Sequence, residues 1–210
     1  MEIIKANNID KNDNLSKVVS ALQIGEVICY PTETIYGLGA DAFNFEANLK
    51  IFALKERQTK KPLLILISKL EMLSLLINDM PLRAKKIVEE FWPGPLTIIF
   101  DIHESINHGL SKLISLDHGI AIRFTSNPCL LKIIEAFGGP ITSTSANPSS
   151  LPNKVNRDDI IKNYSGKIKY FIDDGELNDL RPSTIIDVRN DSLKLLRDGR
   201  ISFNKIKEVL

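Results

Sequence analysis

The stretch Leu63-Leu64-Ile65-Leu66-Ile67 is apolar at every position and follows a basic, polar segment that ends at Pro62. A strand with one face in water alternates apolar and polar side chains, whereas an unbroken apolar strand is typical of a sheet that is covered on both faces. We therefore expect a buried strand here, inside a layered domain.

Helices and strands are also predicted on the N-terminal side of this strand. Apolar residues recur at helical spacing over residues 15–22, and Gly25 ends that helix. The apolar run Val27–Tyr30 is closed by a proline and predicts a second buried strand, followed by a loop over Pro31–Asp41. A further helix around residues 51–54 is expected to end near Arg57.

The C-terminal side continues the alternation and then becomes rich in strands. Helices are expected near Lys69–Ile77, Pro81–Phe91, Pro128–Phe137 and from Phe203, strands over Leu96–Phe100, Ile120–Arg123, Ile141–Thr144, Lys169–Asp173, Thr184–Val188 and Leu193–Leu196, and an irregular connection over Asp101–Gly119. This order favours an α/β or α+β fold with a mixed sheet, and 210 residues fit a single domain over residues 1–210.

Composition excludes several classes of protein. Apolar residues make up 43% and charged residues 25% of the chain, which is not the composition of disordered or fibrous proteins. A net charge of +1 is small for a protein that works along nucleic acid phosphates. The polar N-terminus and the absence of a long apolar run predict a cytoplasmic protein without a membrane segment. Cys29 and Cys129 lie in apolar stretches and are expected to be buried, reduced thiols.

Two apparent motifs have simpler explanations. Residues 37–42 match the G-x-G-x-x-A pattern of dinucleotide-binding enzymes, but six residues separate Tyr30 from Gly37, where the strand should lead directly into the glycines. Glycines in a tight turn are favoured, and a nicotinamide-dependent oxidoreductase is the distant alternative. His103, Glu104 and His108 suggest zinc ligands, yet Asn and Gly residues nearby favour a solvated loop.

Two other features carry more chemical information. Four cations, Lys55, Arg57, Lys60 and Lys61, precede the strand at Leu63; a solvated helix end and a triphosphate site explain them about equally well. Hydroxyl-rich loops at residues 31–34, 142–147 and 182–184 are expected to come after apolar strands, and loops at strand ends are where open α/β sheets bind ligands. Each loop alone also fits turn or capping chemistry.

These features occur within seven sequence blocks that, in this order, resemble the YrdC/TsaC family of threonylcarbamoyl-AMP synthases in its short, single-domain form. The resemblance spans roughly Ala21 to Gly199. The blocks are Tyr30–Gly39, Lys55–Arg57, Phe91–Thr97, Ala121–Arg123, Ser143–Asn147, Ser183–Asp187 and Leu196–Gly199.

The resemblance implies a twisted mixed β-sheet flanked by helices, with one open basic cleft. It implies an enzyme that makes threonylcarbamoyl-AMP and pyrophosphate from L-threonine, bicarbonate or CO2, and ATP with Mg²⁺ on its phosphates. This adenylate serves the N6-threonylcarbamoyladenosine modification of tRNA. The implied partners are therefore a tRNA threonylcarbamoyl-transferase complex and, weakly, tRNA or double-stranded RNA.

The resemblance also implies roles for individual residues. Lys55 and Arg57 are expected to be catalytic through the phosphates, and Trp92 to be structural. The expected ATP-binding residues are Lys55, Arg57, Lys61, Ser145, Asn147, Asn153 and Arg197, and the expected threonine-binding residues are Thr34, Tyr36, Arg123, Ser143 and Ser183.

Some positions depart from the family pattern. Gln58 replaces a common proline, Leu66 replaces a histidine of several members, Asn153 replaces a serine, and residues 148–150 replace a glycine-containing continuation. The alternative interpretation is an RNA-binding or carbamoyl-transfer relative of the same fold, which loss of Lys55, Arg57 or the Ser-Ala-Asn block would have favoured; all are present.

Overall fold

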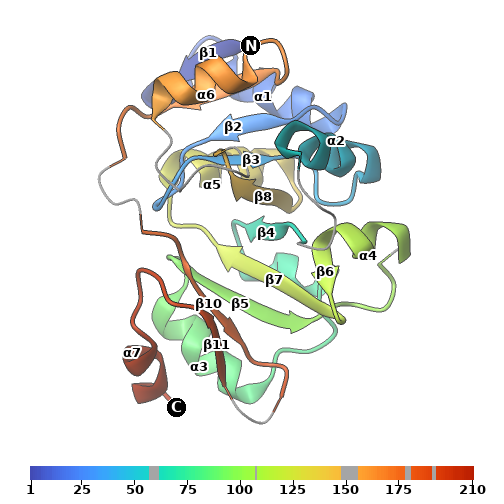
Figure 1. Ribbon diagram of the computed structural model, residues 1–210, viewed down its shortest axis with the longest axis vertical. Coiled ribbons are helices and arrows are strands. Elements are labelled where there is room, and N and C mark those ends of the chain that lie inside the picture. The colour runs from blue at the N-terminus through green and yellow to red at the C-terminus, as the bar shows by residue number, and fades with distance from the viewer. Residues whose placement is uncertain (57–61, 107, 148–155, 178–180, 191–192) are drawn as a thin grey trace.

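The computed structural model describes residues 1–56, 62–106, 108–147, 156–177, 181–190 and 193–210. Within this part of the chain, eleven strands form one mixed sheet and helices lie around it (Figure 1). The strands are β1 Glu2–Lys5, β2 Ile28–Tyr30, β3 Gly37–Gly39, β4 Leu64–Ile67, β5 Leu96–Asp101, β6 Ser115–Leu116, β7 Gly119–Phe124, β8 Ile141–Ser145, β9 Tyr170–Asp173, β10 Thr184–Asp187 and β11 Lys194–Arg197. The helices are α1 Asn14–Gln23, α2 Phe45–Lys55, α3 Leu82–Phe91, α4 His108–Ile114, α5 Pro128–Phe137, α6 Arg157–Tyr164 and α7 Phe203–Glu208, with 3-10 turns η1 Ala6–Asn8 and η2 Leu70–Leu75.

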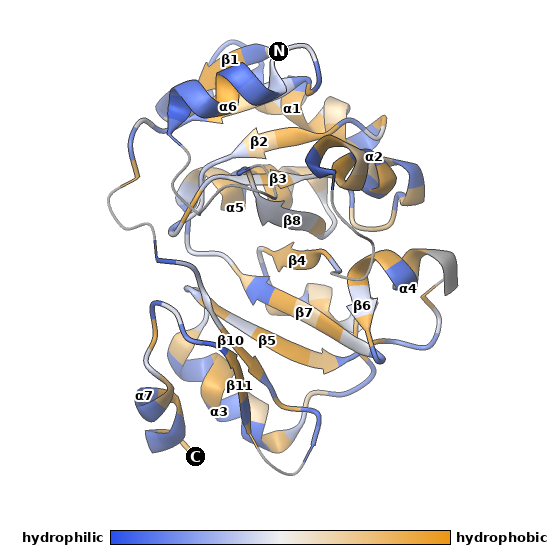
Figure 2. Ribbon diagram, in the orientation of Figure 1, coloured by the Kyte–Doolittle hydropathy of each residue, from blue (hydrophilic) through white to orange (hydrophobic). Residues whose placement is uncertain are grey.

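The strand order brings distant parts of the chain together. It runs β1-β9-β2-β3-β8-β4-β7-β5-β10-β11, and β6 pairs with β7. β4 is parallel to β7 and antiparallel to β8, while β5 is antiparallel to β7 and parallel to β10. Hydrophobic strands fill the middle of the molecule and the hydrophilic helix faces lie outside (Figure 2). The mixed α/β sheet expected from the sequence is confirmed.

Helix ends follow the expected capping chemistry. The Asn127 side chain accepts a hydrogen bond from the Leu130 backbone N–H and caps α5, which ends at Gly138 with φ of 80°. Glycine adopts this left-handed conformation without a steric penalty. Gly25, with φ of 77°, likewise follows α1, so the predicted end of that helix is confirmed.

Strand β4 is buried, with one exception. Ile65, Leu66 and Ile67 are fully buried, whereas Leu64 is only half-buried. Leu64 is at the same time a wall residue of a cavity described below. The expectation of cover on both faces therefore fails at Leu64.

The Pro31–Asp41 loop prediction was wrong for its second half. Residues 37–39 form β3, which is antiparallel to both β2 and β8. A Cβ at Gly39 would lie 2.1 Å from the Thr142 carbonyl oxygen and 2.4 Å from the Tyr30 hydroxyl. These glycines allow neighbouring strands to approach closely, and the tight turn that the sequence favoured for them was wrong.

Other elements were missed or misjudged. The irregular connection predicted over 101–119 contains α4 and β6, because Leu110, Leu113 and Ile114 bury their side chains in the core despite the poor helix formers near by. The helix predicted over 69–77 is a 3-10 turn, and β1 and α6 were not predicted. Cys29 is buried as expected, but Cys129 is only half-buried.

Candidate functional site

A cavity of about 300 Å³ lies along the sheet, from its middle strands to the edge formed by β10 and β11. Its walls come from segments that are far apart in the chain, namely the loop before β3 and strands β4, β5, β7, β8, β10 and β11. The walls combine apolar side chains with hydroxyl and guanidinium groups. The lining residues are Thr32, Thr34, Ile35, Tyr36, Gly37, Pro62, Leu64, Ile99, Ala121, Arg123, Ser143, Thr144, Ser145, Pro182, Ser183, Ile185, Leu196 and Arg197.

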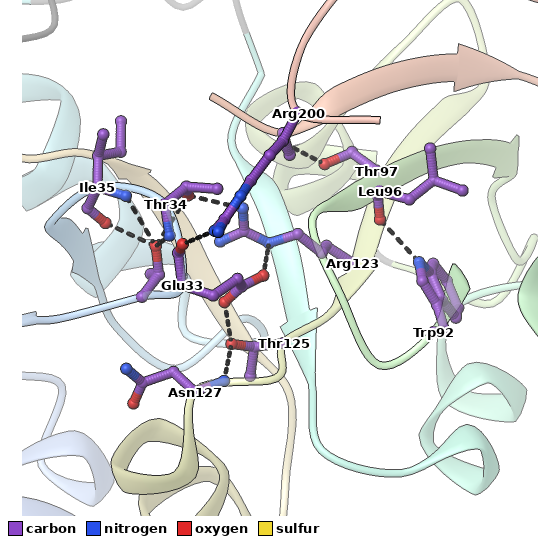
Figure 3. A network of polar contacts seen from close by, with 12 residues as sticks. Glu33, Thr34, Ile35, Trp92, Leu96, Thr97, Arg123, Thr125, Asn127 and Arg200 are labelled. Carbon is purple, nitrogen blue, oxygen red and sulfur yellow. Dashed lines mark hydrogen bonds and ion pairs between the residues drawn. The ribbon is translucent and has the colours of Figure 1, made fainter. Parts of the chain in front are cut away.

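Arg123 contributes a buried positive charge to this cavity. It lies in β7, next to Leu66 of the neighbouring strand, and is only 4% exposed. Its Nη1 donates a hydrogen bond to the Thr34 hydroxyl over 3.3 Å, and its Nε lies 3.6 Å from Oε1 of Glu33 (Figure 3). One hydrogen bond and one ion pair restrict the orientation of this guanidinium group, while its Nε has no hydrogen-bond partner among the described residues; such a buried, planar donor suits recognition of a carboxylate.

Glu33 is the centre of the contacts that hold this arginine. Its Oε2 accepts a hydrogen bond of 2.8 Å from the Thr125 hydroxyl, and its backbone carbonyl oxygen accepts one from Arg200. Figure 3 shows these groups converging from the loop before β3, from β7 and from the C-terminal segment. Glu33 was not among the predicted site residues, although it lies inside the first sequence block.

Ser183 and Arg197 form another part of the cavity wall. Arg197 donates from Nε to the Ser183 carbonyl oxygen and from Nη2 to the Ser183 hydroxyl, each over 2.9 Å. Although part of the Arg197 side chain is exposed, desolvation of its guanidinium group at the cavity wall, and then the positive charge of Arg123, lower its pKa to about 10. Arg197 thus stays protonated at neutral pH, and two cationic side chains share one cavity.

Lys55 lies at the β8 side of the cavity. It is the last residue of α2 and is 5% exposed. Its Nζ donates to the Ser145 carbonyl oxygen and lies 3.3 Å from the Ser145 hydroxyl and 3.4 Å from the Thr144 hydroxyl. Both Ser143 and Ser145 belong to β8, and Asn147 follows it and is buried. The amino group is therefore beside the strand that presents these hydroxyls.

Tyr36 is held at the cavity wall from behind. Its hydroxyl donates to the Gly175 carbonyl oxygen over 2.7 Å and accepts from the Asp174 backbone N–H over 2.9 Å. The adjacent Asp173 carboxylate is bonded to Lys5 and Arg157. This turn after β9 therefore connects the cavity to β1 and α6.

The structure gathers most of the predicted residues that it describes, with the exception of Asn147, which is not a lining residue. Thr34, Tyr36, Arg123, Ser143, Ser145, Ser183 and Arg197 line the cavity, and Lys55 adjoins it. Arg57, Lys61 and Asn153 lie outside the described residues, as do the departures at Gln58 and residues 148–150. Leu66 is fully buried and is not a lining residue. Trp92 donates from its indole to the Leu96 carbonyl oxygen over 2.7 Å, which fits the structural role expected of it.

Two further findings concern metal ligands and membrane-spanning helices. In the part of the chain that the structure describes, no three His, Cys, Asp or Glu side chains gather in a way that would hold a metal ion. His103 was considered above as a zinc ligand. Its Nδ1 lies 2.7 Å from the Ser105 hydroxyl oxygen in an exposed turn. Among the described residues, no helix has the length and apolar character to cross a membrane.

Comparisons with known proteins identify the family of this chain. A family model described as "Telomere recombination", and named for Sua5, YciO and YrdC, matches residues 20–199. The threonylcarbamoyl-AMP synthase of Pyrococcus abyssi is 35% identical over 89% of this chain and 54% of its own length. The synthase of Vibrio parahaemolyticus is 34% identical over 89% of this chain and 100% of its own length.

A solved structure extends the likeness to three dimensions. P. abyssi Sua5 complexed with L-threonine superposes with a TM-score of 0.89 at 31% identity, over 100% of this chain and 61% of that one. The chain thus spans a little over half the length of the P. abyssi protein and the whole length of the Vibrio relative. The match over residues 20–199, together with these relatives, shows that the chain belongs to the Sua5/YciO/YrdC family.

Proposed function

We propose that this protein is an L-threonylcarbamoyladenylate synthase, which uses L-threonine, bicarbonate or CO2, and ATP. The observation that carries the proposal is the convergence of Arg123, Arg197 and Ser183 on one cavity beside Lys55. Relatives of this chain bear the name threonylcarbamoyl-AMP synthase, and one related structure contains L-threonine. A cavity of about 300 Å³ has room for an amino acid and part of a nucleotide.

In the proposed reaction the threonine amino nitrogen attacks the carbon of CO2, which forms a carbamate and releases a proton. A carbamate oxygen then attacks the α-phosphorus of ATP, the bond to the bridging oxygen of the β-phosphate breaks, and pyrophosphate leaves. Neither step needs a protein nucleophile. The protein contributes by holding the reactants together and by placing cations where phosphate charge develops.

The side chains divide between the two substrates in this proposal. Arg123, with Thr34, Ser143 and Ser183, would bind threonine, with Tyr36 as the wall. Lys55, Ser145, Asn147 and Arg197 would bind ATP, together with Arg57, Lys61 and Asn153 from the part of the chain that the structure does not describe. The position of the buried Lys55 amino group beside Ser145 supports the assignment of these two residues to ATP.

Magnesium enters the proposal as part of the MgATP substrate. Mg²⁺ keeps several waters and is commonly bound through substrate phosphates rather than by a protein cage. The cationic groups on the cavity and beside it are suited to phosphates and not to a divalent cation.

The proposed product would pass to a tRNA threonylcarbamoyl-transferase complex, because a mixed anhydride of this kind hydrolyses unless it is used. The open basic cleft and weak binding of tRNA or double-stranded RNA also belong to the proposal. A cytoplasmic location follows from these substrates.

The test is threonine-dependent release of pyrophosphate. Purified protein with MgATP and ¹⁴C-bicarbonate should release pyrophosphate and form a labelled adenylate only when L-threonine is added. Arg123→Gln should abolish both signals, because a buried arginine that binds the substrate carboxylate is lost.

Arg189→Gln is the matched control. Arg189 pairs with Asp187 through hydrogen bonds of 2.7 to 3.2 Å and is not a cavity residue. This variant should keep the activity once its folding is verified by circular dichroism. Absence of threonine-dependent pyrophosphate from the wild-type protein, or RNA binding without ATP turnover, would refute the proposed synthase.

A further inference from the structure

A buried threonine stands directly behind the wall of the cavity. Thr97 lies in β5, is fully buried and is not a lining residue. Its hydroxyl lies 2.8 Å from the hydroxyl of Ser183, which does line the cavity. Parallel pairing of β5 with β10, in which Thr97 is opposite Ile185, keeps the two strands in fixed register.

The direction of this hydrogen bond follows from counting donors and acceptors. Arg197 can only donate, so the Ser183 oxygen accepts its 2.9 Å hydrogen bond. Among the described residues, the Ser183 oxygen is the single hydrogen-bond partner of the Thr97 hydroxyl. If Ser183 donated to Thr97, the buried Thr97 proton would have no acceptor there, and an unsatisfied buried donor costs about 1–3 kcal/mol. Thr97 therefore donates and Ser183 accepts.

This assignment leaves one group of Ser183 unused. A hydroxyl has one proton to donate and two acceptor lone pairs. Arg197 and Thr97 occupy both lone pairs, and the contacts of the described residues provide no acceptor for the Ser183 proton. Since Ser183 is a wall residue, that proton is available to a ligand in the cavity.

We propose that Thr97 is a positioning residue that makes the Ser183 hydroxyl an obligatory hydrogen-bond donor, so that this wall accepts an anionic oxygen of the amino acid substrate and rejects a donor group such as an ammonium. The inference rests on the proposed function for the identity of the ligand as L-threonine. Ser183 is then oriented for the carboxylate or carbamate end of that ligand, on the same side as the two guanidinium groups.

The test measures L-threonine binding by calorimetry without ATP, so that it does not depend on turnover. Thr97→Val keeps the shape of the side chain and removes its hydroxyl. Without the Thr97 donor, one lone pair of the Ser183 oxygen becomes free, so the Ser183 hydroxyl is no longer fixed as a donor toward the cavity and L-threonine affinity should fall about fivefold. Thr97→Ser restores the hydroxyl and should recover most of the affinity.

A double-mutant cycle separates this role from a general packing defect. Ser183→Ala removes the group through which Thr97 is proposed to act, so Thr97→Val should cause no further loss of affinity in the Ser183→Ala background. Thr142→Val is the matched control: this buried threonine of β8 bonds Asn48 and is not a lining residue, and threonine affinity should be unchanged.

Three outcomes overturn the inference: unchanged affinity in Thr97→Val, full additivity of the two losses in the double variant, or an equal loss in Thr142→Val. These outcomes differ from failure of the proposed function. If the wild-type protein bound no L-threonine at all, the proposed substrate itself would be wrong.

Discussion

Replacing Arg123 by lysine keeps the positive charge and removes only the planar fork. In the structure the guanidinium group contacts both Thr34, at 3.3 Å from Nη1, and Glu33, at 3.6 Å from Nε, while lining the cavity. A lysine amino group is a single donor centre and cannot reach both residues and a substrate carboxylate.

The expected loss follows from the contacts involved. A hydrogen bond to a charged group contributes about 1.5–3 kcal/mol, so the loss of one fork contact to the carboxylate should weaken L-threonine binding about 10- to 150-fold. MgATP affinity should change little, since the phosphates are expected at the Lys55 side. Arg189→Lys should leave both affinities unchanged, because its partner Asp187 lies outside the cavity.

The assay is isothermal calorimetry with L-threonine and, separately, with MgATP on the same protein preparation. Thermal melting checks that each variant is folded. Unchanged threonine affinity in Arg123→Lys would refute the carboxylate role of Arg123. An equal loss of affinity for both ligands would show that the substitution damages the whole cavity.

Three further changes test other parts of the structure. Lys55→Ala should lower the rate of pyrophosphate release at least about 100-fold with little change in threonine affinity, because a cation next to developing phosphate charge is lost; the surface variant Lys132→Ala should retain the wild-type rate. Gly39→Ala should lower the free energy of unfolding in urea by about 3 kcal/mol or more, because its Cβ would lie 2.1 Å from the Thr142 carbonyl oxygen; a smaller loss would show that β3 can move. Burial raises the pKa of Asp173, but hydrogen bonds from two cationic side chains outweigh it and hold the pKa below its ordinary value. The resulting stabilisation is present above the unfolded-state pKa of about 4 and is lost as the pH falls through the lower folded-state pKa. Asp173→Asn should therefore melt at a lower temperature than the wild type at pH 7, and its melting temperature should change less than that of the wild type below pH 4. Parallel pH profiles of the two proteins would contradict this.

Much of the fold could be predicted because local signals and tertiary packing agree. The helix from Pro128 to Phe137 has an asparagine cap, an N-terminal proline and a terminal glycine, and the structure places it at those bounds. The buried strand at Leu64–Ile67 also follows directly from its composition. In both cases one segment contains all the information.

The prediction failed for elements whose formation depends on contacts with other segments of the chain. Residues 37–39 have no strand propensity of their own, and only the close approach of Tyr30 and Thr142 explains why glycine is needed there. Likewise α4 forms because its leucines reach the core, which local propensity does not reveal.

The candidate site likewise contains residues that the sequence predicted and residues that only the structure reveals. Its cationic and hydroxyl residues were predicted from the family resemblance, whereas Glu33 and Thr97 contribute through contacts that sequence spacing does not encode. Glu33 acts on a residue 90 positions away, and Thr97 on one 86 positions away. The roles of such residues can be identified only from the arrangement of the strands in the structure.

The most direct measurement is a crystal structure of this protein with L-threonine and a non-hydrolysable ATP analogue. The account predicts that the threonine carboxylate lies within hydrogen-bond distance of Arg123 and Ser183, and that the nucleotide phosphates lie at the Lys55 side of the same cavity. Threonine bound at another surface, or phosphates remote from Lys55, would contradict it.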